Sequence, residues 1–531
     1  MKKIIVALTV ALSAINMSVK AKTVIKINSQ TDFDRISERI NTILSKGETD
    51  VLVSIERGTY FFKENHVNLW GTNFPDAVLT IEGNGSTIVS AGKDLLSGAV
   101  VSPYKSYISH QTGIIDVWGG IHQLYTQIDV LSQKTGRCKL NYAGTAFIPS
   151  KKGKDAYIRI TEWFRSSIYK IEKVEQGYIY FIADNLARGY GGGWNVNDDY
   201  NYGRVFPRFC VFGPLTESAH ECSFVRFLSL GYGASLKKLN ISGFHFLGNA
   251  RDGEHGLMDF MSPNCICEVL NCSFEGMKSS RVISIGNKNK VSIISCHFLK
   301  CYEDCINASH ASLATRVTDC SFENCGLAMT NSFCVSCSGT DAYIADNTFV
   351  DFGYSAIGLG YGYKNNHENI ISAIAERNKI LYSKKYIDNI GQHSIMDSGA
   401  IYVSTQNDNT VIRYNTITDY MGIKDNRGIF CDDGANNVHI YGNTVSGIAD
   451  GNFSIDSRRC ANIETEHGSK VKRTNINNRV FDNIVDAPIR FEPREGKDNG
   501  CYLGENLNTK VGVKSAKLKR LRRRIKRMSR R

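Results

Sequence analysis

One short pattern of apolar and polar positions recurs along this chain. Segments near Val317, Ile344, Val411 and His439 contain the order apolar, any, any, polar, any, apolar. With looser copies included, the central polar residues are Cys272, Cys296, Cys320, Asn347, Asn378, Asn415, Asn443 and Asn483, and the first three are 24 residues apart. A repeat this short cannot bury its own apolar face, so its copies must stack into a solenoid. Alternating Val, Ile, Phe and Thr residues predict that each copy forms strands.

Two regions of the N-terminal half depart from this pattern. Within residues 31–47, Phe33, Ile36, Ile40 and Ile43 recur at helical spacing before a glycine. This spacing predicts a helix, which would cover the exposed strand edges of the first coil. Residues 98–235 lose the repeat but keep strand-like pieces, so we expect an inserted β-rich region there.

The first residues predict a secretory signal. Lys2 and Lys3 precede a mostly apolar stretch that is too short to span a bilayer, and small residues follow at positions 19 and 21. We therefore expect an exported protein, periplasmic or secreted. The expected division is a signal peptide at 1–21, a cap and first coils at 22–97, the insertion at 98–235, coils with the candidate site at 236–500 and a basic tail at 501–531.

The net charge of +12 is concentrated at the two ends of the chain. Residues 514–531 contain eleven basic residues and no acid, and the leader contains three more, so residues 22–513 carry a net −2. A nearly neutral body argues against a specific nucleic-acid partner. The tail has Leu518, Leu521 and Ile525 at helical spacing, so it is expected to be a disordered arm or a basic amphipathic helix that contacts an anionic surface.

Sixteen cysteines in an exported chain would first suggest disulfides. However, Cys272, Cys296 and Cys320 fall in one column, and Cys301 and Cys325 fall in another. Side chains in register on neighbouring parallel strands point the same way, so three in one column cannot all pair. We therefore expect reduced, buried stacks in which the thiols act as small hydrophobic groups.

With its helical cap, Asn column and Cys column, the chain resembles the right-handed parallel β-helix proteins of the pectate-lyase-like superfamily over residues 22–90 and 236–495. The resemblance implies an all-β fold, a single-stranded right-handed parallel β-helix with an N-terminal helical cap and an inserted β region. Stacked amides hydrogen-bond along such a column, so the Asn residues are expected to be mechanical and not catalytic.

Carboxylates gather at one position in the last coils. The segments 305–309, 356–360, 400–404, 428–432, 452–456 and 488–492 align without gaps, and their fifth residues are Ser309, Gly360, Ser404, Asp432, Asp456 and Glu492. Equivalent residues on adjacent coils stack about 4.8 Å apart. Like charges at that spacing are unfavourable unless a site uses them, so the alignment predicts a functional carboxylate column.

Paired carboxylates suit glycoside hydrolysis. Separations of about 5–5.5 Å are typical of retaining enzymes and about 6.5–9.5 Å of inverting ones. Adjacent coils would give the shorter separation and alternate coils the longer. A calcium site, lyase chemistry and a set of solvated turn acids are the alternative interpretations of the same column.

Residues 397–445 resemble the part of bacterial β-helix glycoside hydrolases in which GAIY is followed by GIY-x-DDG and a GN turn. The resemblance places Asp432 and Asp433 in the DD pair and Asp397 before the GAIY strand, which makes all three candidate catalytic residues. The chain has Phe430-Cys431 where Tyr-Leu is common and Ala435 where Ser is common, and these differences leave the carboxylates intact.

Two other motifs are less specific. Residues 303–306 resemble the DDCI motif of polygalacturonases, but the expected GHG and RIK motifs are missing downstream, so an ordinary turn is the expected role. Arg281, Lys288 and Lys290 resemble the basic residues with which lyases abstract a sugar proton, and solvated turn residues are the alternative.

These patterns indicate an exported carbohydrate-active enzyme, a glycoside hydrolase with a polysaccharide substrate. Asp432 and Asp456 are the expected acid/base and nucleophile pair, with Glu492 as the substitute if the spacing is wider. The candidate substrate binders are His393, Arg427 and Arg458. We expect no cofactor and no metal, except calcium if the activity is that of a polysaccharide lyase on an acidic glycan. A non-catalytic glycan-binding surface protein is the remaining alternative.

Overall fold

The computed structural model describes most of the chain from residue 22 onward. The described residues are 22–62, 66–90, 128–132, 135, 137–141, 157–162, 165–175, 178–182, 208–212, 226–231, 233–249, 256–263, 265–277, 281–301, 304–309, 312–326, 332–360, 372–383, 396–404, 409–420, 424–432, 435–457, 463–464, 470–471, 477–492, 500–510 and 515–529. The expected signal peptide lies outside them.

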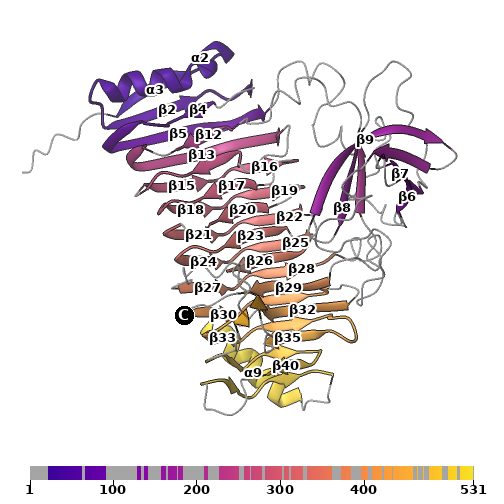
Figure 1. Cartoon of the computed structure of the whole chain (residues 1–531). Helices are drawn as coiled ribbons and strands as arrows, with labels where there is room; N and C mark the ends of the chain where they lie inside the picture. Colours follow the sequence, from indigo (N-terminus) through magenta and orange to yellow (C-terminus); the bar gives the residue numbers. More distant parts are fainter. Residues whose placement is uncertain are drawn as a thin grey trace, which may run out of the picture.

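Parallel strands stacked coil upon coil form a solenoid, which confirms the parallel β-helix (Figure 1). The first face is a 23-stranded sheet in which each strand pairs in parallel with its equivalents on the neighbouring coils. Its strands are β1 (Thr23–Ile27), β2 (Asp50–Ile55), β3 (Thr59–Phe61), β5 (Asn73–Ser90), β13 (Ser235–Asn249), β15 (Ile266–Leu270), β16 (Ser273–Glu275), β18 (Lys290–Ile294), β19 (His297–Leu299), β21 (Ala314–Thr318), β22 (Ser321–Cys325), β24 (Asp341–Ala345), β25 (Thr348–Phe352), β27 (Ser372–Glu376), β28 (Lys379–Leu381), β30 (Thr410–Arg413), β31 (Thr416–Thr418), β33 (Val438–Tyr441), β34 (Thr444–Ser446), β38 (Arg479–Phe481), β39 (Ile484–Val485), β41 (Tyr502–Leu503) and β42 (Leu507–Asn508).

The second face of the solenoid is an 11-stranded parallel sheet. Its strands, in spatial order, are β4 (Val67–Asn68), β12 (Leu228–Leu230), β14 (Met258–Phe260), β17 (Arg281–Ile285), β20 (Asp304–Ala308), β23 (Phe333–Cys337), β26 (Ser355–Leu359), β29 (Met396–Val403), β32 (Lys424–Cys431), β35 (Phe453–Ser457) and β40 (Ile489–Phe491). Because β4 pairs directly with β12, the coils before and after the insertion are neighbours in one stack.

Two short helices cover the first coil, as the helical spacing predicted (Figure 1). They are α2 (Gln30–Asp34) and α3 (Ile36–Ser45), with a break at Arg35 in place of the single helix expected over 31–47. The Ser29 side chain accepts a hydrogen bond from the Asp32 N–H and so caps α2. The apolar side chains Phe33, Ile36, Ile40 and Leu44 are fully buried over the strands below.

The inserted region contains its own antiparallel sheet. Its described strands are β6 (Ile128–Ser132), β7 (Arg137–Asn141), β8 (Tyr157–Glu162), β9 (Arg165–Glu175), β10 (Tyr178–Ile182) and β11 (Arg208–Phe212), in the order β11-β8-β9-β10-β7-β6. The solenoid already resumes at β12, before the expected boundary at residue 235. At the other end, β41 and β42 extend it beyond residue 500.

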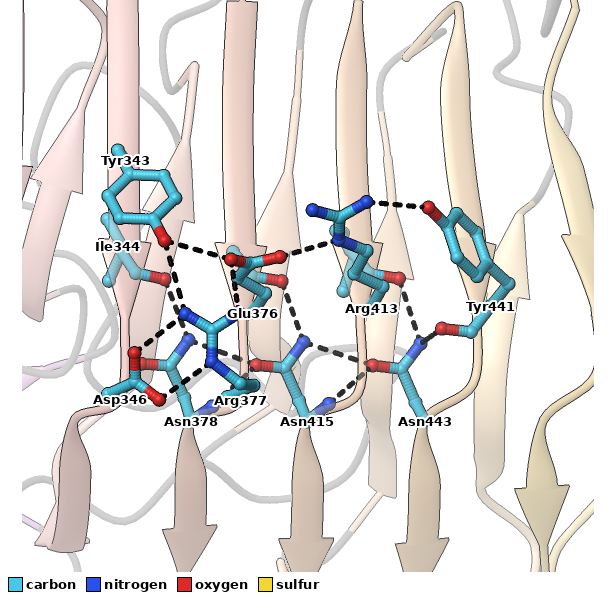
Figure 2. Close-up of polar contacts among 12 residues, drawn as sticks. Tyr343, Ile344, Asp346, Glu376, Arg377, Asn378, Arg413, Asn415, Tyr441 and Asn443 are labelled. Atoms are coloured by element: carbon cyan, nitrogen blue, oxygen red, sulfur yellow. Dashed lines mark hydrogen bonds and ion pairs between the residues drawn. The ribbon is translucent and has the colours of Figure 1, made fainter. Parts of the chain in front are cut away.

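An asparagine ladder runs through a turn of the solenoid (Figure 2). Each Nδ2 donates to the Oδ1 of the next asparagine at 3.0 Å along Asn347, Asn378, Asn415, Asn443 and Asn483, and Asn506 continues the row. The residue before each of these five asparagines has a positive φ, and glycine takes that position at Gly442. The ladder therefore satisfies buried amides that the turn would otherwise leave without partners.

Apolar side chains form parallel stacks inside the coils. The rings of Phe246, Phe274, Phe298, Phe322 and Phe349 follow one another with centroids 4.7–5.2 Å apart and nearly parallel planes. In the earlier coils, cysteines take the ladder position of the asparagines, and the Cys320 N–H donates to the Asn347 Oδ1 at 2.9 Å where the two ladders meet. The cysteine columns lie buried inside the solenoid, as expected, and the reduced state of their thiols stays a prediction.

The C-terminal tail forms the amphipathic helix α9 (Ser515–Met528), one of the two expected forms. It lies beside the last coils of the stack (Figure 1). None of the helices in the described part of the chain combines the length and apolarity needed to cross a membrane.

The asparagine ladder predicts a stability loss for Asn415→Ala. The Asn415 Oδ1 accepts from both the N–H and the Nδ2 of Asn378, and its Nδ2 donates to Asn443 and to the Ala375 carbonyl. Removing the amide leaves buried groups unpaired, which costs about 1–3 kcal/mol per group, so we expect a loss of about 3 kcal/mol. Urea unfolding measures it, and the exposed neighbour Thr416 supplies the control Thr416→Ala, expected within about 0.5 kcal/mol of wild type. Equal effects of the two substitutions would contradict the ladder's role.

The cysteine stacks predict thiols that react only after unfolding. Burial raises the pKa of Cys337 to about 12, and apart from the partly buried Cys501 the recorded free cysteines are buried. Without reductant, a thiol reagent should titrate at least twelve thiols in denaturant and on the order of one of them rapidly in native buffer. A denatured count close to zero would show that the columns are oxidised.

Candidate functional site

The candidate site lies on the outward face of the 11-stranded sheet, at its C-terminal coils. Successive side chains of a strand point to opposite faces. Ile429 and Ile455 stack in register inside the solenoid, so Phe430 and Asp456, the next residues, share the outward face. The same register places Tyr402 opposite Phe430 on one side and Arg490 opposite Asp456 on the other.

Asp456 is held by two arginines. Its Oδ2 accepts from the Arg427 Nε at 2.9 Å, its Oδ1 accepts from the Arg490 Nε at 2.8 Å, and the Arg490 Nη2 contacts Oδ2 as well. Asp456 and Arg427 are both 0% exposed, whereas the Arg490 side chain is 27% exposed. A buried carboxylate needs such compensation, and removing one partner of a buried pair costs about 3–5 kcal/mol. The arginines therefore fix the orientation of the Asp456 side chain.

Aromatic rings support both guanidinium groups. The Arg427 guanidinium lies over the Phe430 ring at 4.0 Å, and that of Arg490 lies over Phe453 at 4.4 Å. The face of an aromatic ring attracts a cation and limits its movement. Arg427 is in register with Phe453 of the next coil, so each arginine has an aromatic ring beside it.

Asp432 lies at the end of β32, beside the preceding coil. Its Oδ2 accepts a hydrogen bond from the Tyr402 hydroxyl at 2.8 Å, and the residue is 2% exposed. Burial raises the pKa of the neighbouring Cys431 thiol, and the charges of Asp456 and Asp432 raise it further. Asp432 and Asp456 therefore both lie within electrostatic reach of one interior side chain.

The expected carboxylate column is wrong by two residues at Asp456. Asp456 lies opposite Phe430 and Arg490, not opposite Asp432 and Glu492. The gapless alignment matched Phe453 with the interior column, which is in fact occupied by Ile455. Since the shift is even, Asp456 stays on the expected face.

Of the other expected site residues, the structure describes Glu492 and the backbone of Asp397. The register places Glu492 two coils from Asp432, about 10 Å away at strand spacing, and Glu492 is exposed. Asp397 belongs to β29, but its side chain is outside what the structure describes. The expected residues that lie outside the described part of the chain are Asp433, His393 and Arg458.

Tyr402, Arg490 and Phe430 belong to the site, although the sequence did not single them out. They occupy one outward column with Asp456, so the correct register would have found them. A signal for these residues was present in the sequence. The outward positions of the late strands carry large polar or aromatic residues, whereas the equivalent positions of earlier coils carry Ser336 and Gly358.

Asp304, in the motif similar to DDCI, has an unusual environment in β20. Burial raises the pKa of this carboxyl to about 6, although the Phe333 N–H and the Asn307 amide, each 2.8 Å away, and the Arg281 charge act to lower it. A carboxyl of this kind can exchange protons near neutral pH. Several strands separate β20 from β32 and β35, so Asp304 lies apart from Asp432 and Asp456.

A second polar cluster lies on the 23-stranded sheet (Figure 2). Glu376 accepts from the Tyr343 hydroxyl at 2.9 Å and from the Arg413 Nε at 2.5 Å, and it contacts Arg377, which also pairs with Asp346 at 2.7 Å. Burial acts to raise the pKa of Glu376, but hydrogen bonds from Arg413, Tyr343 and Arg377 outweigh it and hold the pKa below its ordinary value. Glu376 is therefore a clamp between coils, unsuited to donating a proton.

The described residues contain one compact group of metal-ligand atoms, the buried thiols of Cys301, Cys305 and Cys325, all within 4.8 Å of one another. The sulfurs of Cys301 and Cys325 donate to carbonyls of Phe274 and Phe298 at 3.7 and 3.4 Å, which fits protonated thiols packed in the core. In the described part of the chain, Asp432, Asp456 and Glu492 do not form a comparable three-carboxylate group.

Comparison with known proteins gives little beyond this geometry. No protein-family model and no curated protein match the chain. A solved chain titled "Glycoside hydrolase" is similar over 95% of this chain and 98% of that chain, at 11% sequence identity and a TM-score of 0.47. The parallel β-helix is established by the strand register, independently of this match.

The raised pKa of Asp304 predicts a pH-dependent stability. The unfolded carboxyl has its ordinary pKa near 3.8, so between about pH 4 and 6 the folded protein binds more protons, and stability falls as pH rises through this window. Between pH 5 and pH 7.5 the wild type should lose about 1.4 kcal/mol more than Asp304→Asn, measured by urea unfolding. The same pH dependence in both proteins would contradict the assignment.

Proposed function

We propose that the protein is an exported carbohydrate-active enzyme, a glycoside hydrolase that cleaves a complex polysaccharide on the outward face of β29, β32 and β35. The observation that carries this proposal is the placement of Asp432 and Asp456 on one face of successive coils, beside Tyr402, Arg427 and Arg490. The leader-like residues 1–21 support export to the periplasm or the medium.

The register supports the inverting type of hydrolysis. One step between strands, about 4.8 Å, and two residues along a strand, about 6.6 Å, separate the backbone positions of Asp432 and Asp456 by about 8 Å. Both side chains leave the same face, and we propose that their carboxylates keep a separation of this order. Inverting enzymes place their carboxyl groups about 6.5–9.5 Å apart, which leaves room for a water molecule.

In this proposal Asp456 is the base and Asp432 is the acid. The two arginines orient Asp456, and their three hydrogen bonds leave one of about four lone-pair positions for the attacking water. Tyr402 orients Asp432 toward the leaving-group oxygen. Arg427 positions Asp456 through its Nε, and Arg490, whose side chain is 27% exposed, takes the role at the glycan that was expected of Arg427.

The remaining candidates keep supporting roles in the proposal. Glu492 is the substitute carboxylate, Asp433 follows the acid in sequence, and Asp397 precedes the GAIY strand of the preceding coil. His393 precedes β29 and Arg458 follows β35 in sequence, and in this proposal both would bind the glycan.

Substituting the acid predicts a selective loss of activity. A panel of polysaccharides first identifies the substrate by release of reducing ends. Asp432→Asn should then lower kcat by about 10²–10⁴-fold, the usual contribution of a general acid, with little change in melting temperature. The matched control is Glu323→Gln, an exposed carboxylate on β22 in the other sheet, which should keep full activity. Unchanged kcat in Asp432→Asn would refute the assignment of the acid.

Asp456→Asn is less diagnostic, because it leaves two arginines without their anion and should cost about 3 kcal/mol of stability. Tyr402→Phe is more informative. It removes only the hydroxyl that contacts Asp432, so it should shift the pH profile of kcat while the fold stays intact.

A polysaccharide lyase is the second candidate, supported by the partly exposed Arg490, which could neutralise a uronate carboxylate at the site. A lyase would release unsaturated sugars that absorb in the ultraviolet and would add calcium dependence, whereas a hydrolase releases reducing ends without that absorbance. Retained binding with no product from any polysaccharide would favour the non-catalytic glycan-binding protein.

A further inference from the structure

Helix α9 has two chemically distinct sides. Its half-buried positions are Leu518, Leu521, Ile525 and Met528, whereas its exposed positions are Arg520, Arg522, Arg523, Arg524, Lys526 and Arg527. The helix contains no acidic residue, so its cations are not neutralised within the helix. A fourteen-residue helix with this division is marginal on its own and gains stability where a surface receives both sides.

The solenoid holds α9 at its C-terminal end. The Arg524 Nη2 pairs with the Asp482 Oδ2 at 2.9 Å, and Asp482 lies in the turn between β38 and β39. Most of the other basic side chains of α9 project into solvent, beside the last coils (Figure 1). The body of the chain is close to neutral, so α9 is the strongest concentration of charge that the molecule presents.

We propose that α9 binds the anionic lipid headgroups of a membrane surface and anchors the protein there. Each Lys or Arg close to an anionic leaflet contributes to attraction. The apolar residues of α9 are half-buried where the helix lies beside the coils, so they add affinity by entering the headgroup–acyl boundary once the Arg524–Asp482 pair opens and α9 turns toward the membrane. An acidic polysaccharide would also attract the cations, but it would make no use of the apolar stripe. The amphipathic division of α9 therefore favours a lipid surface.

The test is co-sedimentation of the full chain with vesicles of phosphatidylglycerol and phosphatidylcholine, compared with vesicles of phosphatidylcholine alone. We expect binding only to the anionic vesicles, with marked weakening in high salt. The triple variant Arg520→Gln, Arg523→Gln, Arg527→Gln should bind on the order of 100-fold more weakly, since each cation near the surface contributes about one factor of five.

Two further sets of substitutions separate the apolar contribution of α9 from its charge and from the charge of the rest of the protein. Leu521→Gln with Ile525→Gln keeps every charge and should also weaken vesicle binding. Lys26→Gln, Arg57→Gln and Lys379→Gln together remove three exposed charges elsewhere and should leave it unchanged. Equal binding to both kinds of vesicle, or equal loss in the remote triple variant, would overturn the proposal.

The glycan alternative has its own outcome. Retention on immobilised polygalacturonate that depends on the α9 cations, together with vesicle binding that the Leu521 and Ile525 substitutions leave intact, would overturn the membrane proposal and assign α9 to an acidic polysaccharide. These measurements use no enzymatic readout, so their failure would not count against the proposed catalytic site, and failure of that site would not count against membrane binding.

Discussion

The strand register between successive coils is the constraint on which the rest of the structure depends. Parallel pairing fixes each residue opposite one residue of the next coil, and a stacked column must then satisfy the same chemistry at every level. Asparagine meets this condition in a buried turn, because its amide both donates and accepts along the row. The coil-to-coil hydrogen bonds, the Phe stack and the Cys columns are consequences of one register.

The same constraint explains how a site arises on such a scaffold. Early coils carry small residues at the outward positions of the 11-stranded sheet, whereas the late coils carry Tyr402, Phe430, Asp456 and Arg490 in one column. Like charges at strand spacing would repel, and in this column Asp456 instead has Phe430 on one side and the oppositely charged Arg490 on the other, while Arg427 reaches it from the neighbouring strand. The burial of this network gives it fixed geometry, which acid–base catalysis requires.

Much of the fold could be predicted from sequence because its signals are local and periodic. The helical cap and the basic helix follow from spacing within a few residues, and the Asn and Cys columns follow from a repeat of 24 residues or more. The site was harder, because Phe453 and Ile455 both fit an interior position and a two-residue slip preserves the alternation of faces. The partners of Asp456 come from other coils, so only the register reveals them. The insertion lacks the repeat, and its antiparallel strand order could not be derived from periodicity.

We propose that the register separates Asp432 from Asp456 by a distance typical of inverting enzymes. The direct test is a proton NMR time course of hydrolysis that records the anomeric configuration of the sugar released first. We expect the anomer opposite to that of the cleaved linkage, followed by slow mutarotation. Initial release of the anomer with the same configuration as the linkage would contradict it, because that outcome requires carboxyl groups only about 5–5.5 Å apart.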